Sequence, residues 1–221
     1  MTPHERVRTA ITGGTLDRKP IIVWSQSPGH DADCVAVGYE SLRHALDTHP
    51  NQLVLAQVYS PIGRATRTSV PLLRIFEDNP LEGDKLLSEI ALEAGNVIDL
   101  ALEMGAAGIF YRLDGAYQSL MTPMQYGGHF LEHDRALLER AKGAEFNLLQ
   151  IEGEEPIYFD AVSDLPAHAV TWNRHLTGLD IETARAAWPK AIALDQIEAD
   201  MIFVKSYEMA RDMLGDESSQ K

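Results

Sequence analysis

A chain of 221 residues with 45% hydrophobic and 24% charged residues has the size and composition of one globular domain with a sizeable core. Its formal net charge of −14 argues against nucleic acid or an anionic membrane as a partner, because a uniformly acidic surface repels phosphate. No apolar run is long enough to cross a bilayer, the N-terminus lacks a secretory signal, and the single cysteine fits a reducing compartment, so we expect one cytoplasmic domain over residues 1–221.

Helical and strand-like segments alternate along the first half of the chain. Thr2-Pro3-His4-Glu5 has the pattern of a capping box and opens a helix that stops at Gly13-Gly14. Apolar runs predict strands over 20–24, 53–59 and 109–111, and helical spacing predicts further helices over 39–48, 62–76 and 85–104. Pro71 is expected to break or kink the helix that contains it.

The alternation continues in the second half. Strands are predicted over 146–151, 169–172 and 191–194, helices over 123–143, 177–187 and 200–214, and a short helix or turn over 156–164. Strands that alternate with helices favour a parallel sheet, either a (β/α) barrel or a doubly wound sheet. No glycine-rich phosphate loop follows any predicted strand, which disfavours the nucleotide-binding version of the doubly wound sheet.

Chemically active side chains come at the ends of two predicted strands. Arg112 and Asp114 follow the strand at 109–111, and Gln150 and Glu152 end or follow the strand at 146–151. In a parallel α/β barrel, catalytic groups lie at the carboxyl ends of the strands. Arg112 and Asp114 are candidates for clamping a carboxylate, the alternative being a structural ion pair. Glu152 is a candidate general acid or base, the alternative being an exposed acidic turn.

Three aromatic residues, Trp24, Tyr59 and Trp172, lie near predicted strand ends. They are candidates for lining a flat pocket that holds a ring system. Packing in the core explains them equally well, because large aromatic side chains dominate protein cores.

Metal-capable side chains occur in two places. One short segment holds His30, Asp31, Asp33 and Cys34. Its spacing fits no known metal site, so we expect a solvated polar loop. His129 and His133 lie four residues apart on a predicted helix, without the glutamate of a metalloprotease motif, and we expect them to be surface histidines. No bound metal is expected.

Five short blocks occur in a defined order within residues 4–195. They are Glu5-Arg6-Val7 through Leu16-Asp17-Arg18-Lys19-Pro20-Ile21, Tyr59-Ser60-Pro61, Gly105-Ala106-Ala107-Gly108-Ile109-Phe110-Tyr111, Leu148-Leu149-Gln150-Ile151-Glu152-Gly153 and Val170-Thr171-Trp172-Asn173. As an ordered set they resemble the uroporphyrinogen decarboxylase superfamily, which includes the cobalamin-dependent methyltransferases. The resemblance implies a TIM-type (β/α) barrel with its pocket at the carboxyl ends of the strands.

The chain departs from that family in length. The segment between Asp33 and Leu53 is much shorter, and no counterpart of the family's C-terminal Gly-His segment follows Leu194. Only six strands are predicted, whereas a full barrel has eight. We therefore expect a barrel that is truncated relative to the eight-stranded form. Because an incomplete barrel leaves unpaired backbone groups at an edge, we expect a homodimer that covers this edge or the flank of the barrel.

The resemblance also implies site residues. In the loop after the first strand only Gln26 has an evident match, and His30 ends the same loop. The family's later tyrosine falls near Arg67. The methyltransferases bind zinc through a His-x-Cys pair, and Gln150 and Glu152 stand at those two positions, so no zinc is expected. The expected ligand contacts are Trp24, Gln26, His30, Tyr59, Arg67, Gln150, Trp172 and Asn173.

The function expected on these grounds is that of a divergent uroporphyrinogen decarboxylase-like protein, which would place it near porphyrin biosynthesis. It would bind a small carboxylated, tetrapyrrole-like molecule without a cofactor. If it is an enzyme, it is a decarboxylase, a lyase in which Arg112 holds a carboxylate while Asp114 or Glu152 transfers a proton. Two alternatives stay open, a zinc-free relative of the corrinoid-dependent methyltransferases and a non-catalytic binding or partner subunit.

Overall fold

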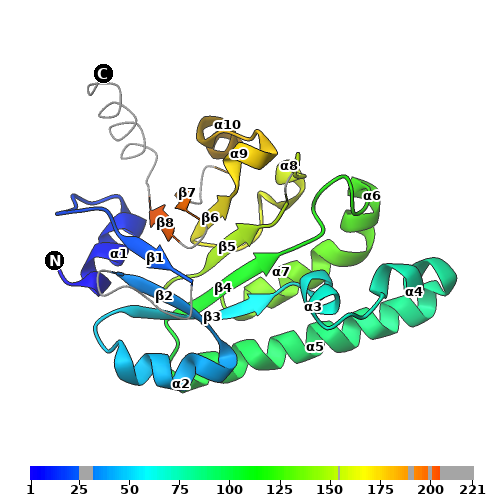
Figure 1. Ribbon diagram of the computed structural model, residues 1–221, viewed down its shortest axis with the longest axis horizontal. Coiled ribbons are helices and arrows are strands. Elements are labelled where there is room, and N and C mark those ends of the chain that lie inside the picture. Colours follow the sequence, from blue (N-terminus) through cyan, green and yellow to red (C-terminus); the bar gives the residue numbers. More distant parts are fainter. Residues whose placement is uncertain (25–31, 154, 189–191, 199–200, 205–221) are drawn as a thin grey trace.

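The computed structural model describes residues 1–24, 32–153, 155–188, 192–198 and 201–204, and within these ranges eight strands form a closed barrel in chain order (Figure 1). The strands are β1 (Ile21–Val23), β2 (Cys34–Gly38), β3 (Leu53–Tyr59), β4 (Gly108–Leu113), β5 (Leu148–Ile151), β6 (Ala169–Trp172), β7 (Ile192–Glu198) and β8 (Met201–Val204). Neighbours from β1 to β7 pair in parallel. The expected α/β, TIM-type barrel is therefore confirmed.

The barrel is closed by one antiparallel strand. β8 pairs antiparallel with β7 on one side and with β1 on the other. In a full barrel of this type, the eighth strand is parallel to the other seven and is followed by a helix. Here the antiparallel strand β8 takes that place, and in this sense the barrel is truncated. Closure within one chain leaves no free edge between β1 and β8. The expected homodimer loses its premise, because it rested on an uncovered edge.

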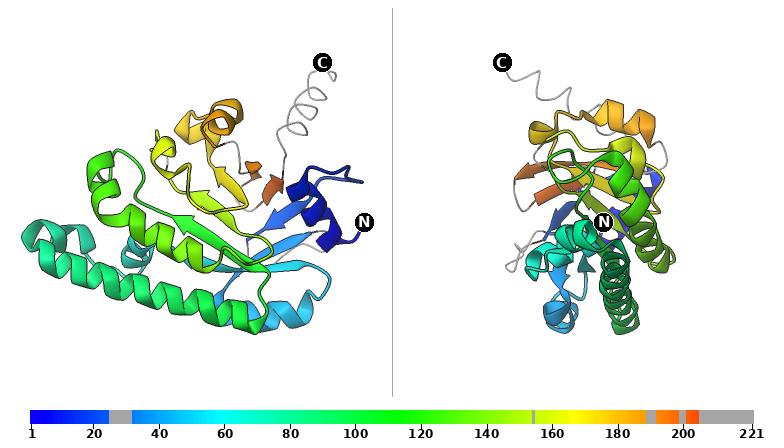
Figure 2. Two further views of the ribbon diagram at one scale, coloured as in Figure 1. Left: turned by 180° about the vertical axis from the view of Figure 1, so that it is seen from behind. Right: turned by 90° about the vertical axis from the view of Figure 1, so that its right-hand side faces the viewer.

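Helices cover the outside and one end of the barrel. They are α1 (Pro3–Thr12), α2 (Tyr39–Thr48), α3 (Pro61–Arg67), α4 (Leu72–Asp78), α5 (Pro80–Met104), α6 (Pro123–Gln125), the π-helix η1 (Tyr126–Phe130), α7 (Leu131–Arg140), α8 (Phe159–Val162), α9 (Arg174–Thr177) and α10 (Ile181–Ala187). Figure 2 shows α5 as the longest helix, running beside α7 along the outside of the sheet. None of the helices in the described ranges has both the length and the apolar character of a membrane span.

Local sequence signals explain where several helices begin and end. The Thr2 hydroxyl accepts a hydrogen bond from the Glu5 amide, and the Glu5 carboxylate accepts one from the Thr2 amide, which is the expected capping box. Pro71 separates α3 from α4, as expected. Gly105 ends α5 in the left-handed region at φ 105°, where a residue without Cβ is favoured. Gly108 then opens β4, and a Cβ there would lie 2.0 Å from the Phe146 carbonyl oxygen.

Two strands differ from the sequence expectation. β2 begins at Cys34, inside the segment expected to be a solvated polar loop, and Asp33 and Cys34 are both fully buried. β8 occupies 201–204, the beginning of the helix expected over 200–214. Both strands are short, and a short apolar run is compatible with either a strand or a buried helix. Pairing with neighbouring strands decides the outcome.

An ion-pair cluster closes the N-terminal end of the barrel around Asp33. The Arg6 guanidinium donates to Asp33, and Arg18 donates to both Asp33 carboxylate oxygens at 2.6 and 3.0 Å. Arg6 also donates to Asp17 at 2.7 and 2.8 Å, and this pairing holds the pKa of Asp17 below its usual range. The Glu5-Arg6 and Asp17-Arg18 blocks that carried the family resemblance thus have a structural role here.

The two largest hydrophobic clusters of the core lie on opposite faces of the strands. The inner part fills the barrel and includes two α1 residues that cap its N-terminal end: Val7, Ala10, Ile22, Cys34, Ala36, Leu53, Leu55, Phe110, Leu148 and Ala169. The outer part packs the sheet against the helices and includes Val58, Ile109, Tyr111, Leu113, Leu149, Ile151, Val170 and Trp172. Side chains alternate between the two faces of a strand. The inward-facing positions of β3 to β6 are therefore followed, toward the carboxyl ends of these strands, by polar residues.

Candidate functional site at the barrel mouth

Polar residues occupy the inner positions at the carboxyl ends of four neighbouring strands. Tyr59 on β3 pairs with Arg112 on β4, Arg112 pairs with Gln150 on β5, and Gln150 pairs with Thr171 on β6. On β4, β5 and β6, the inward-facing residue two positions before each of these is not charged or amide-bearing: Phe110, Leu148 and Ala169. On β3, the residue two positions before Tyr59 is Gln57. The interior of the barrel is therefore mainly apolar toward the N-terminal ends of the strands and polar at their carboxyl ends. We call Tyr59, Arg112, Gln150 and Thr171 the polar layer.

An ion pair between Arg112 and Glu152 stands on the polar layer. The Arg112 Nε and Nη2 groups both contact Glu152 Oε1, and the two side chains are 18% and 25% exposed. The Glu152 amide donates to the Leu113 carbonyl at 2.8 Å, so the chain keeps its strand path beyond β5. Burial raises the pKa of Glu152, while the charges of Arg112 and then Arg67 oppose the rise. Glu152 is thus a partly desolvated carboxylate beside a cation, at the place where barrel enzymes put their chemistry.

The Tyr59 ring lies close to two guanidinium groups. The Arg67 guanidinium carbon is 4.0 Å from the ring centroid and that of Arg112 is 5.4 Å away. Gln57 Nε2 donates to the Tyr59 hydroxyl and holds the ring from below. Arg67 is exposed at the end of α3, whereas Arg112 is partly buried. The structure therefore brings together Tyr59, Arg67 and Arg112, three residues expected at the site.

Asp114 lies next to this pair in the loop after β4. Its amide donates to the Ser60 hydroxyl at 3.0 Å, and its Oδ1 accepts from the Gly115 amide at 2.8 Å. The Tyr117 hydroxyl lies near the Asp114 carboxylate. Burial first, and then the Asp114 charge, raise the pKa of Tyr117 above its usual range. Tyr117 and Thr171 of the polar layer are site residues that the sequence alone did not indicate, and for Tyr117 its position three residues beyond Asp114 is the signal that could have found it.

Gln150 carries a buried acceptor beside Arg112, its partner on β4. Its side chain belongs to a residue that is 6% exposed, and its Nε2 donates to Glu152 Oε2 at 3.4 Å. Its Oε1 atom is buried and has no hydrogen-bond partner among the described residues. Burial of a carbonyl oxygen without a partner is unfavourable and rare in folded proteins.

Two expected site residues point elsewhere. Trp172 is 1% exposed and faces the outer core, where its ring packs 5.4 Å from that of Phe159 and its Nε1 donates to the Leu179 carbonyl at 2.8 Å. The Asn173 Oδ1 accepts from the Leu176 amide at 3.2 Å and caps α9. The structure therefore does not bring Trp172 or the Asn173 side chain to the mouth.

Trp24 lies on the other side of the mouth. Its ring is 5.5 Å from that of Phe110 inside the barrel. A cavity of about 560 Å³ runs from Trp24, Gln57 and Tyr59 toward α2. Its volume lies within the range typical of small-molecule sites. Gln26 and His30 lie outside the described residues.

Among the described residues, the metal-capable side chains do not come together at one place. No group of three or more histidine, cysteine or acidic residues that could hold a metal occurs within the described ranges. His129 lies in η1, where it packs 4.9 Å from Phe76 and approaches Asp84 at 3.7 Å. His133 is half-buried on α7, and burial lowers its pKa. Asp33 is paired with arginines, and burial raises the pKa of the Cys34 thiol.

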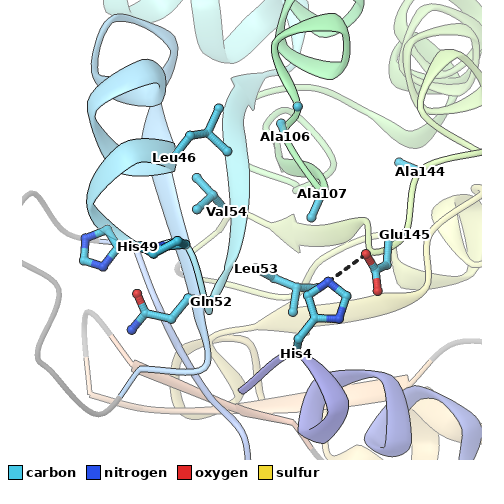
Figure 3. Close-up of a pocket in the computed structure, with 12 residues that line it drawn as sticks. His4, Leu46, His49, Gln52, Leu53, Val54, Ala106, Ala107, Ala144 and Glu145 are labelled. Carbon is cyan, nitrogen blue, oxygen red and sulfur yellow. Dashed lines mark ion pairs between the residues drawn. The ribbon is translucent and has the colours of Figure 1, made fainter. Parts of the chain in front are cut away.

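A separate cavity of about 380 Å³ lies at the opposite end of the barrel (Figure 3). It is lined by residues at the beginning of β3 and just before β4, together with His4, whose Nε2 is 3.0 Å from a Glu145 carboxylate oxygen. In barrel enzymes the N-terminal end of the strands serves stability and the carboxyl end serves chemistry. The mouth therefore remains the candidate site.

Comparisons with known proteins bear on the fold. No family model and no curated protein matches the chain. The chain is similar in structure to a methyltransferase from Methanosarcina mazei, with 12% identity and a TM-score of 0.58, over 70% of this chain and 46% of that one. It is also similar to PhdJ bound to a substrate intermediate, with 11% identity and a TM-score of 0.44, over 87% and 51% of the two chains. The chain thus spans about half the length of each. At such identities the likeness concerns the barrel alone.

Proposed function

We propose that this protein binds a small carboxylated molecule at the barrel mouth and transfers a proton to it, as a divergent relative of the uroporphyrinogen decarboxylases. The observation that carries the proposal is the Arg112–Glu152 pair, which joins the carboxyl ends of β4 and β5 at a partly buried position. Arginine binds carboxylates with paired hydrogen bonds. A carboxyl group with a raised pKa is suited to proton transfer near neutral pH.

The existing ion pair gives the first step of a mechanism. A ligand carboxylate that binds Arg112 takes the place of the Glu152 carboxylate, with Arg67 as a second cation nearby. Glu152 then loses its counter-charge while it stays partly buried near Asp114, so it takes up a proton. Ligand binding thus converts Glu152 from a salt-bridge partner into a general acid.

A decarboxylation at this site balances as follows. The bond between a substrate carbon and its carboxylate breaks, carbon dioxide leaves, and the electron pair stays on that carbon. Glu152 donates its proton to the carbon, and solvent returns a proton to Glu152. Arg112 orients the substrate through a second carboxylate, so the substrate class has at least two carboxyl groups. Asp114 and Tyr117 supply polar groups in the loop after β4, next to Arg112 and Glu152.

The fold likeness to the Methanosarcina mazei methyltransferase favours methyl transfer as a second candidate function. Zinc–thiolate activation does not fit this chain, because Gln150 and Glu152 offer amide and carboxylate atoms where thiolate chemistry needs cysteine sulfur. A methyl-transfer reaction here would depend on Arg112 and Glu152 for binding and proton transfer.

Calorimetric titration with acetate, succinate and coproporphyrin tests the proposal. Arg112→Ala should weaken binding of any carboxylate that binds the wild-type protein by about 1.5–3 kcal/mol, because a charge-assisted pair is lost. Arg64→Ala is the matched control, since Arg64 lies on α3 and pairs with Glu93 at 2.8 Å away from the polar layer. The proposal fails if no carboxylate binds, or if Arg112→Ala leaves binding unchanged and mainly lowers the melting temperature.

A further inference from the structure

We infer that the ligand of the barrel mouth is a carboxylate that also carries a hydroxyl or amino group, which donates a hydrogen bond to Gln150 Oε1. The inference rests on the proposed carboxylate site and names the substrate class more closely. Its basis is the buried Gln150 Oε1 atom, which has no partner among the described residues.

The orientation of the Gln150 amide follows from its neighbour. Gln150 Nε2 donates to Glu152 Oε2 at 3.4 Å. The opposite orientation would place an amide oxygen against a carboxylate oxygen, which is repulsive when Glu152 is ionised. The amide oxygen therefore faces away from Glu152 and presents an acceptor on the inner face of β5.

The acceptor lies beside the carboxylate-binding arginine. Arg112 and Gln150 are direct partners on β4 and β5. Neighbouring strands lie about 4.8 Å apart, so a ligand that binds Arg112 through a carboxylate reaches Gln150 within two or three bonds. A hydroxyl or amino group at that distance from the carboxylate supplies the missing donor, and a donor-free ligand leaves Gln150 Oε1 unsatisfied.

A site built around a buried acceptor discriminates against ligands that lack the matching donor, because those ligands leave the acceptor unpaired. The other ionisable groups at the mouth agree with this choice. Glu152 and Asp114 accept hydrogen bonds and Arg112 donates them, while Arg67 places a second cation over the Tyr59 ring. The mouth therefore matches a ligand with an anionic end and a donor group close to it.

Matched pairs of dicarboxylates test the inference. Malate differs from succinate by one hydroxyl, and glutamate differs from glutarate by one amino group. In calorimetric titrations of the wild-type protein, at least one donor-bearing probe should bind about tenfold more tightly than its donor-free partner. Gln150→Met keeps the length of the side chain and removes the acceptor. It should remove this preference, so that the two members of each pair bind with equal affinity.

Gln52→Met is the control variant, because Gln52 Oε1 is also buried without a partner among the described residues but lies beside the cavity at the opposite end of the barrel. It should leave the preference for the donor-bearing probe in place. If wild-type protein binds both members of each pair equally, with Arg112-dependent affinity, the inference is overturned and the proposed function stands. If neither member of any pair binds, both are overturned. A preference that persists in Gln150→Met also overturns the inference, because Glu152 and Asp114 are acceptors at the same mouth.

Discussion

Glu152 lies two residues beyond Gln150, the direct β5 partner of Arg112, yet its carboxylate accepts hydrogen bonds from the Arg112 guanidinium. The contact joins two segments that are 40 residues apart in the chain. It joins β4 and the segment after β5 at the polar end of the barrel, and a carboxylate that binds Arg112, as proposed above, would compete with Glu152.

This competition predicts a pH dependence of ligand binding. A carboxylate that displaces Glu152 is bound together with one proton, so affinity should fall as the pH rises above the pKa of Glu152, by up to about tenfold per pH unit. Glu152→Gln keeps the shape of the side chain and removes the titrating group. Titrations between pH 5 and pH 9 should show a flat profile for the variant, while any proton-transfer activity is lost. A wild-type profile as flat as that of the variant would contradict the displacement step.

The cluster at the other end of the barrel predicts a stability effect. Asp33 is fully buried and accepts hydrogen bonds from Arg6 and Arg18. Asp33→Ala should lower the free energy of unfolding by about 3–5 kcal/mol, because Arg6 stays buried without this partner. Urea unfolding followed by circular dichroism measures the loss. Glu89→Ala serves as the comparison, since its pair with Lys85 is exposed and should contribute less than about 1 kcal/mol.

A buried carboxyl group outside the site predicts a pH dependence of stability. Asp134 on α7 accepts hydrogen bonds from the hydroxyls of Tyr111 and Tyr126 at 2.6 and 2.8 Å, and burial raises its pKa to about 7. Its folded-state pKa exceeds the unfolded value of 3.8, so the folded protein binds more protons between the two values. The Asp134 contribution to stability is therefore complete below about pH 4 and is lost as the pH rises through about 7.

Asp134→Asn removes this titration. Between pH 4 and pH 7, the free energy of unfolding of the wild-type protein should fall relative to that of Asp134→Asn. Above pH 8 the difference between the two should stay constant. Chemical denaturation at each pH measures it. A difference that does not change across this range would show that Asp134 titrates at an ordinary pKa in the folded protein.

The single cysteine should be inert in the folded protein. Cys34 is fully buried at the start of β2, and burial followed by the nearby Asp33 charge raises the pKa of its thiol. The thiolate is the reactive form, so an aromatic disulfide reagent should label Cys34 only after unfolding. Labelling rates with and without urea provide the measurement. Rapid labelling of native protein would mean that β1 and β2 separate readily.

The register explains why some site residues could be predicted and others could not. Arg112, Asp114 and Glu152 could be placed because each follows an apolar run that reads as a strand. Trp172 also ends such a run, but whether its side chain points into the barrel or toward the helices depends on how β6 pairs with its neighbours. A shift by one residue reverses the face on which a side chain lies. Tyr117 escaped because it lies in a loop, where no periodicity marks direction.

The sequence by itself determined the alternation of strands and helices, the capped first helix, the break at Pro71 and the strand ends that carry Arg112 and Glu152, since these follow from local hydrophobic periodicity and backbone stereochemistry. Only the tertiary structure decided that β8 closes the barrel against β1 and that Asp33 is buried between two arginines. It also decided that Gln150, beside Arg112, has an acceptor without a partner among the described residues. These features depend on contacts between segments distant in the chain, and the free energy of such contacts is set by burial and pairing rather than by local propensity.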